Sequence, residues 1–171
     1  ATHLTLYEIA RKKQVLPLTY LAAKRLADRV KSGEFIFLIT GAGIKPYLWA
    51  GETDGPLGVA TLGRMLDWAF RAKPVIITDK EKMDALVATC NAAGLAVQPE
   101  EWVRRREYGA AIAESLPLGD EEAKTTAEKL VEKYSPAAMI AIEMTGINTC
   151  GVMHSVNGVD ITPYVAKAHH L

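Results

Sequence analysis

Two stretches rich in glycine and polar side chains carry the residue types that can do chemistry. The first, residues 41–58, contains Glu52 and Asp54, two carboxylates that are separated by one residue and flanked by glycines. Such carboxylates can converge on a cation or an amine, and a helix that begins near Asp54 offers free backbone N–H groups to an anion. A small substrate with both an ammonium and a carboxylate group would suit both features. In the alternative interpretation, Asp54 only caps the helix and Glu52 is a solvated loop residue.

The second stretch, residues 143–160, begins with a carboxylate that ends an otherwise apolar segment. Glu143 is costly to bury there unless it is paired or faces a site, where it can act as a general acid or base. An edge carboxylate at the exit of a strand is an equally acceptable explanation. His154 lies between Glu143 and Asp160 and is a second candidate for proton transfer, although a lone histidine is more often structural. Asn148 offers both a hydrogen-bond donor and an acceptor.

These residue types give the following set of candidates. We expect catalytic roles for Asp54, Glu143 and His154. Backbone and polar groups of the same two stretches are expected to bind the substrate: Gly41, Gly43, Glu52, Thr53, Gly55, Asn148 and Asp160. No cofactor is certain from the sequence, and a divalent metal held by the carboxylates is an open alternative without assigned ligands. A dinucleotide fingerprint is not favoured, because its third glycine would have to stand at Pro46.

The elements that must position these stretches alternate between strand and helix. The continuous apolar run over residues 35–39 is typical of a strand buried on both faces of a parallel sheet. We predict further strands over residues 74–78, 95–97 and 138–142, and helices over 17–31, after Asp54, after Asp79, over 108–115 and after Asp120, with these three aspartates as N-caps.

This alternation predicts an α/β fold, a three-layer, mostly parallel Rossmann-like sheet with helices on both faces. In open α/β sheets, ligands bind outside the carboxyl ends of the strands. Both polar stretches follow predicted strands. We therefore expect them to meet at one edge of the sheet and to form a single site.

The composition limits the function classes. The chain has 171 residues, with 20 Lys+Arg against 20 Asp+Glu, and this balance argues against a nucleic-acid partner. Its longest strongly apolar run, residues 35–39, is far too short to cross a bilayer. Cys90 and Cys150 provide neither a disulfide framework nor a zinc-binding spacing. We expect a cytoplasmic protein with a small-molecule substrate and without nucleic-acid or membrane partners.

Two motifs resemble a known family. Residues 37–41 (FLITG), followed by residues 51–58 (GETDGPLG), resemble the opening motif of the D-glutamate cyclase-like family. This domain forms the C-terminal part of mitochondrial D-glutamate cyclase and also occurs in stand-alone bacterial relatives. Glu143, Gly146, Asn148, Gly151 and His154, through residues 158–160 (GVD), are similar to its second signature. The resemblance runs from about residue 33 to the C-terminus, and the first thirty residues are similar to the leading helices of the family.

The resemblance implies a hydro-lyase that closes D-glutamate to 5-oxo-D-proline, or that acts on a related small amino acid or lactam. Two positions depart from the pattern: Met144 stands where the family suggests a basic residue, and Thr145 replaces a proline-like turn. Loss of an arginine would remove a carboxylate clamp, so the substrate can differ from glutamate. A hydrolase of a small cyclic amide or imide and a non-catalytic ligand-binding subunit or sensor are the alternatives.

The resemblance also implies a partner. The family domain continues into a further strand and a polar loop, whereas this sequence stops at Leu171. We interpret residues 1–171 as one α/β domain, the N-terminal portion of the full family domain, with residues 1–32 as leading helices. An unfinished sheet would expose an apolar face, so we expect a second subunit, or the other half of a cleaved chain, to complete it in a hetero- or homo-oligomer. The alternative is a truncated piece of the family domain.

Overall fold

A computed structural model describes residues 2–106 and 108–171, with only the backbone of residues 2 and 3. The chain divides into two compact units, Ala1–Val30 and Lys31–Leu171. The first unit contains helices α1 (Thr2–Lys12) and α2 (Leu18–Arg29). Helix α2 matches the helix predicted over residues 17–31, but none of its residues is buried. That residues 1–171 form one domain stays a prediction.

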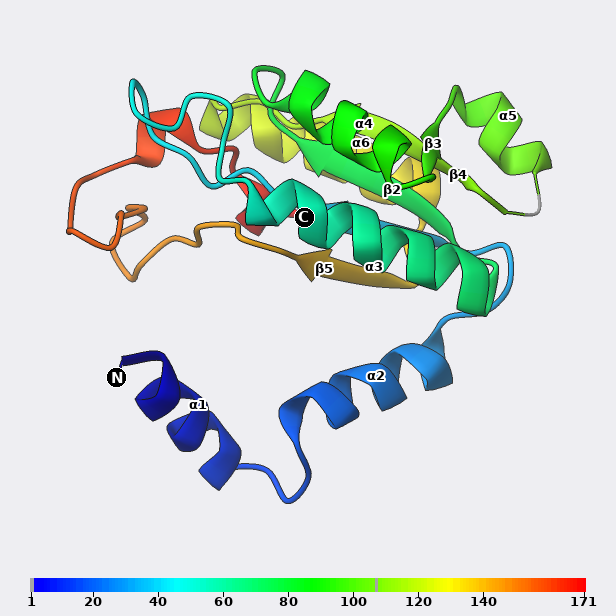
Figure 1. The fold of residues 1–171 in the computed structure, drawn as a ribbon. Helices are drawn as coiled ribbons and strands as arrows, with labels where there is room; N and C mark the ends of the chain where they lie inside the picture. The colour runs from blue at the N-terminus through cyan, green and yellow to red at the C-terminus, as the bar shows by residue number, and fades with distance from the viewer. Residues whose placement is uncertain (1, 107) are drawn as a thin grey trace. The chain divides into compact units, whose positions relative to one another are not determined.

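The second unit is a five-stranded parallel sheet in the order β3-β4-β2-β1-β5 (Figure 1). Its strands are β1 (Phe35–Ile39), β2 (Lys73–Thr78), β3 (Ala96–Val97), β4 (Ala110–Ser115) and β5 (Ala138–Ala141). Its helices are α3 (Asp54–Phe70), α4 (Met83–Ala92), α5 (Glu100–Arg105), α6 (Asp120–Tyr134) and the short 3₁₀ turns η1 (Thr162–Tyr164) and η2 (Ala168–His170).

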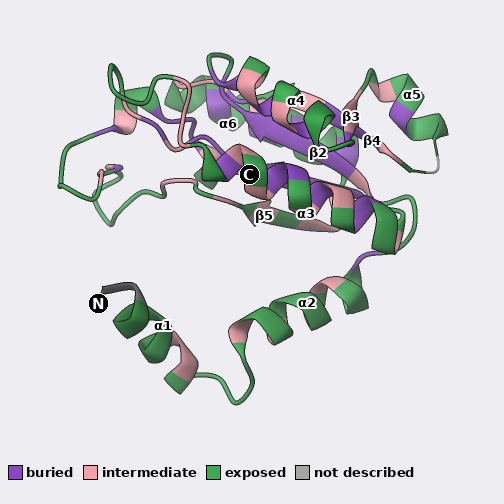
Figure 2. Cartoon of the chain, in the orientation of Figure 1, coloured by how far each residue is buried: buried purple, intermediate pink, exposed green. Residues whose placement is uncertain are grey.

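The side chains of β1 alternate between two covered faces of the sheet. Phe35, Phe37 and Ile39 belong to an apolar cluster that α6 completes with Ala123, Ala127, Leu130 and Tyr134. Leu38 faces α3, where a Cβ added to Gly63 would lie 3.0 Å from its Cδ1. All five residues of β1 are buried, and the buried colour in Figure 2 gathers on the central strands and the inner side of α3. The α/β class and the three layers are therefore confirmed.

One predicted helix is wrong. Residues 110–115, which lie inside the helix predicted over 108–115, form strand β4, with Ile112 opposite Val75 of β2. Alanine favours helices in isolation, but small side chains also fit a strand that lies inside a sheet and is covered by helices. Pairing with β2 and β3 on both sides outweighs the local preference.

The predicted aspartate caps are also wrong in detail. Helix α3 begins at Asp54 with Thr53 as N-cap, and no side chain caps it. The Asp54 carboxylate instead accepts a hydrogen bond from the Gly55 N–H at 3.1 Å. Helix α4 begins only at Met83, after a turn that contains Asp79, and α6 begins with Asp120 itself. Helices α3 and α6 begin at the predicted cap residue itself, and α4 begins about one turn after Asp79. None of the three aspartates therefore occupies the N-cap position.

Within residues 2–106 and 108–171, no helix has the length and apolar character needed to cross a membrane.

Candidate functional site

The two polar stretches begin side by side because their strands are neighbours. Strands β1 and β5 run parallel with Ile39 opposite Ala141, so both chains leave the sheet at the same edge. Just beyond, the Ala42 N–H donates to the Glu143 carbonyl at 3.0 Å, and the Glu52 N–H donates to the Ala42 carbonyl at 2.9 Å. These hydrogen bonds join both ends of the first loop to the start of the second.

Three carboxylates meet at this edge. Glu52, Asp54 and Glu143 each offer an oxygen that lies within 4.8 Å of the other two. Glu143 has a φ of 44°, a left-handed conformation that is costly for a residue with a side chain. Asp54 reaches the cluster from the first turn of α3. We call these three residues the carboxylate cluster.

The carboxylate cluster carries negative charge without a basic partner. In the part of the chain that the structure describes, no lysine or arginine forms an ion pair with Glu52, Asp54 or Glu143. Burial, and next the charges of Asp54 and Glu143, raise the pKa of Glu52. The arrangement therefore favours a bound cation, which can be an ammonium group or a divalent ion with oxygen ligands.

A small, partly open hollow lies beside the carboxylate cluster and has a free volume of about 10 Å³. This is room for about one water-sized polar atom, so the hollow can take one polar atom of a ligand and not a whole molecule. Its lining combines residues from the ends of β1 and β2 and from both polar stretches: Thr40, Gly41, Ala42, Gly51, Glu52, Pro56, Thr78, Lys82 and Glu143.

Thr78 gives independent evidence that the hollow accepts a ligand. Its side chain is fully buried, and its hydroxyl has no hydrogen-bond partner among the described residues. Gly41 lies over it with a φ of 150°, and a Cβ there would stand 3.1 Å from the Thr78 Oγ1. Buried hydroxyls are nearly always hydrogen-bonded, so an unpartnered one in a site wall indicates a place for a ligand's polar atom.

Lys82 is a basic residue of the site that the sequence analysis missed. Its ammonium lies 2.5 Å from the Asp79 carboxylate, and both side chains are more than nine-tenths buried. It also donates to the Tyr164 carbonyl at 3.3 Å. Its aliphatic stem lies close to two glycines: a Cβ on Gly43 would stand 2.9 Å from Lys82 Cε, and one on Gly51 would stand 3.1 Å from Cδ.

A signal for Lys82 was present in the sequence. Residues 79–82 directly follow the strand predicted over 74–78, and the carboxyl ends of parallel strands are where ligands bind. The two polar stretches at residues 41–58 and 143–160 do not include the end of β2. Gly43 and Gly51 leave space for the Lys82 side chain, which follows β2. The spacing of residues along the sequence does not reveal this contact.

The other predicted residues fall into two groups. Thr53 and Gly55 flank Asp54 at the start of α3, and a Cβ on Gly55 would clash with the Thr40 hydroxyl and lie 3.4 Å from Glu143 Cβ. Asn148, His154 and Asp160 do not line the hollow.

In the second polar stretch, residues 143–160, the Asn148 side-chain oxygen accepts from the N–H groups of Cys150 and Val152 at 2.8 and 3.0 Å. His154 pairs with Asp160 in an antiparallel bridge, and Asp160 accepts from the Thr162 N–H at 2.9 Å. The Asn148 amide lies 3.4 Å from the His154 ring. The structure therefore gives these three residues contacts that shape a turn, and it brings only Glu143 from this stretch into the carboxylate cluster.

Met144 follows Glu143 at the position where a basic residue was expected. It is partly buried and packs against two apolar clusters, one of which contains Met153, Ile161 and Val165. The basic group that lines the hollow is instead Lys82.

Comparison with known families gives one match that covers most of the chain. Residues 10–171 match the family described as D-glutamate cyclase-like, C-terminal. No curated protein matches the chain.

Proposed function

This chain belongs to the D-glutamate cyclase-like family, and from that premise we propose that it is a lyase that forms 5-oxo-D-proline from D-glutamate, or the corresponding lactam from a related small amino acid. The observation that carries the proposal is the carboxylate cluster without a basic partner, beside a hollow that contains Lys82 and the unpartnered Thr78 hydroxyl. The cluster suits an ammonium group, and the hollow suits one oxygen of a carboxylate group.

The reaction makes clear which groups a catalyst must supply. The amine nitrogen attacks the carbon of the side-chain carboxyl group, a C–N bond forms, and one C–O bond breaks. The ammonium group loses two protons in total, and both end on the departing oxygen, which leaves as water. Such a reaction needs a base near the amine and an acid near the carboxyl oxygen.

Two members of the carboxylate cluster suit these roles. We assign the base to Glu143, which lies two residues beyond the end of β5 with a left-handed backbone and whose carboxylate lies beside the other two. We assign the acid to Glu52, which lines the hollow beside Glu143 and whose pKa is raised by burial and by the charges of Asp54 and Glu143. Asp54 holds the ammonium group. His154 was a candidate base in the sequence, but it does not line the hollow.

Lys82 and Thr78 suit the remaining carboxylate of the substrate. The Lys82 ammonium has three N–H donors, of which two are directed to Asp79 and Tyr164, so a third is left for a ligand. The Thr78 hydroxyl supplies a donor that the protein does not use.

The carboxylate cluster also fits a divalent cation, because its donors are all carboxylate oxygens, as Mg²⁺ and Mn²⁺ prefer. Such an ion would neutralise the cluster and polarise a substrate oxygen. The residues that would hold it are Glu52, Asp54 and Glu143. Loss of turnover in EDTA, with recovery on adding Mg²⁺ or Mn²⁺, would assign the cluster to a metal instead of the ammonium group.

Proton NMR of the purified protein with D-glutamate tests the proposal. We expect the signals of 5-oxoproline to grow with the native chain and with Glu128→Gln, an exposed control on α6. They should not grow with Glu143→Gln. Saturable binding without product would favour a sensor, and ring opening of a lactam without closure of any amino acid would favour a hydrolase. Full activity of Glu143→Gln would remove Glu143 from the mechanism.

We also propose that another chain adds to the sheet beside β5. This strand is the last in the sheet order, and no described strand pairs with its outer side. Its residues alternate between half-buried and exposed, and Met139 is 45% exposed. An unpaired apolar edge strand is a common site of pairing with a partner. Light scattering after gel filtration tests this: a species well above 18.6 kDa supports the proposal, and a strict monomer contradicts it.

A further inference from the structure

A second cluster of metal-ligating side chains lies outside the proposed active site. The side chains of Asp120, His169 and His170 each offer a ligand atom within 4.8 Å of the other two. The His170 Nε2 lies 3.0 Å from Asp120 Oδ1, and the His169 Nε2 lies 3.6 Å from the same oxygen. Two imidazole rings from adjacent residues therefore converge on one carboxylate oxygen.

The backbone around these residues is held by the core. Asp120 is the first residue of α6, whose inner face carries buried Ala123, Ala127 and Leu130. On the other side, the neighbours of the two histidines, Ala168 and Leu171, pack against the same apolar cluster. The two rings lie with their centroids 4.2 Å apart. Their convergence follows from this packing and not only from flexible side chains at the surface.

The accessibility of the cluster suits an ion that keeps contact with solvent. The side chains of His169 and His170 are 23% and 18% exposed, while Asp120 is 58% exposed. The ring nitrogens are partly shielded, and the carboxylate faces water. Three protein ligands with one open side leave further coordination positions for water.

We propose that Asp120, His169 and His170 form a binding site for a divalent transition-metal ion of the zinc, cobalt or nickel type. Two imidazole nitrogens and one carboxylate oxygen are preferred by these ions, whereas Mg²⁺ and Ca²⁺ prefer oxygen ligands alone. With bonds of about 2.0–2.2 Å, the ligand atoms around a tetrahedral ion lie roughly 3.4 Å apart. The distances from Asp120 Oδ1 to the two ring nitrogens are already close to this value, so only the spacing between the two histidine nitrogens needs adjustment by side-chain rotation.

The charged residues near the three ligands have opposite effects on the binding of a cation. Glu121 and Glu122 add negative charge in the first turn of α6. Lys167 opposes a cation, but its ammonium is buried and donates to the carbonyls of Thr162 and Val165 at 2.6 and 2.7 Å. A bound ion would join the last turn of the chain to α6. It would thereby stabilise the segment that contains Tyr164, whose carbonyl accepts from Lys82.

Calorimetric titration of chelator-treated protein with ZnCl₂ tests the site. We expect one zinc ion per chain at these ligands, and at least tenfold weaker binding for Asp120→Asn and for the double variant His169→Asn/His170→Asn. His154→Asn, which changes a histidine outside the site, and Glu52→Gln, which weakens the carboxylate cluster, should bind zinc as the native chain does. Circular dichroism of the metal-free variants establishes that each one is folded.

Thermal unfolding gives a second readout. Zinc should raise the midpoint of the native chain and of His154→Asn, because an ion that binds only the folded state stabilises it. It should leave the midpoint of Asp120→Asn nearly unchanged. The proposal is overturned if the native chain binds no zinc saturably, if the double histidine variant binds it equally well, or if Glu52→Gln alone abolishes the binding.

Discussion

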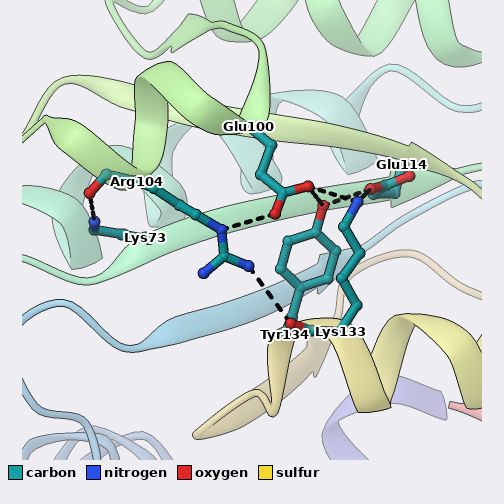
Figure 3. Close-up of polar contacts among 6 residues, drawn as sticks. All are labelled: Lys73, Glu100, Arg104, Glu114, Lys133 and Tyr134. Atoms are coloured by element: carbon teal, nitrogen blue, oxygen red, sulfur yellow. Dashed lines mark hydrogen bonds and ion pairs between the residues drawn. The ribbon is translucent and has the colours of Figure 1, made fainter.

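Two groups of acidic residues in this protein differ in how their charge is balanced. Around α5 and α6, Glu100 accepts from Arg104 at 2.7 Å and pairs with Lys133 at 2.6 Å (Figure 3). Lys133 also pairs with Glu114 at 3.0 Å, and the Tyr134 hydroxyl donates to Glu114 at 2.5 Å. We call these five residues the balanced network. In the carboxylate cluster, by contrast, three acidic groups face one another without a basic partner among the described residues.

The pKa values reflect this contrast. Hydrogen bonds from Lys133 and then Arg104 lower the pKa of Glu100 to about 2. Burial, Asp54 and Glu143 shift the pKa of Glu52 in the opposite direction, upward. Carboxylates that pair with basic side chains stabilise the fold. Carboxylates that face one another without a basic partner cost stability, and such groups are typical of sites where a ligand supplies the opposite charge. This difference supports our proposal that the carboxylate cluster binds a ligand, whereas the balanced network stabilises the fold.

Glu143→Gln should have the largest effect. We expect it to lower kcat by about a hundredfold or more, since loss of a general base typically costs 10²–10⁴ in rate. The fold should remain intact because Glu143 is exposed. Steady-state turnover of D-glutamate measures the effect, with Glu128→Gln as the control. A similar loss in the control would show that the assay reports stability and not chemistry.

Lys82→Met should destabilise the fold by about 3 kcal/mol, because it leaves the buried Asp79 carboxylate without a partner. The double variant Asp79→Asn/Lys82→Met removes both charges and should recover much of this loss. Urea unfolding measures the free energy of all three proteins. If both variants unfold at the same urea concentration as the native chain, the buried pair has no structural role.

Glu100→Gln should lower the free energy of unfolding by about 1 kcal/mol at pH 7, as expected for one member of a partly exposed ion-pair network. Because the pKa of Glu100 is lowered in the folded state, its contribution is present above pH 4.5 and is lost as the pH falls toward 2. Thermal unfolding across this range measures it. A difference from the native chain that does not shrink in acid would contradict the balanced network.

Glu52→Gln should give the smallest effect, and one of opposite sign. The pKa of Glu52 is raised in the folded state, so its ionised form costs stability, and this cost appears as the pH rises through the folded-state pKa. The Glu52→Gln variant should therefore have a free energy of unfolding about 0.5 kcal/mol higher than that of the native chain at pH 7. At an acidic pH where Glu52 is protonated, the two proteins should be equally stable. Thermal unfolding at both pH values measures this gain. A clear loss of stability at pH 7 would mean that Glu52 has a stabilising partner.

The sequence predicted the sheet because its strands are strongly patterned. The uninterrupted apolar run at Phe35–Ile39 indicated a strand covered on both faces, and the alternation with helices indicated parallel order. Strand β4 was missed because its alanines carry no strand preference of their own and its identity depends on pairing with β2 and β3. The residue types within one segment do not show which distant strands will pair with it.

Only some residues of the candidate site could be identified from the sequence. Glu52, Asp54 and Glu143 stand in polar stretches that directly follow or precede regular elements, so their types and positions identified them. Lys82 and Thr78 come from a third strand end, and their role depends on burial and on contact with Gly41, Gly43 and Gly51. Asn148, His154 and Asp160 fit the expected residue types, but the structure gives them contacts within their own loop.

Chemical-shift mapping with D-glutamate tests most directly whether the carboxylate cluster binds the ligand. In ¹⁵N-labelled protein we predict that the amide signals of Ala42, Glu52 and Gly55 move with saturation, while those of Glu100 and Glu114 stay unchanged. The same titration of Glu52→Gln should need more ligand. Shifts confined to residues 148–160, or to the balanced network, would contradict the account.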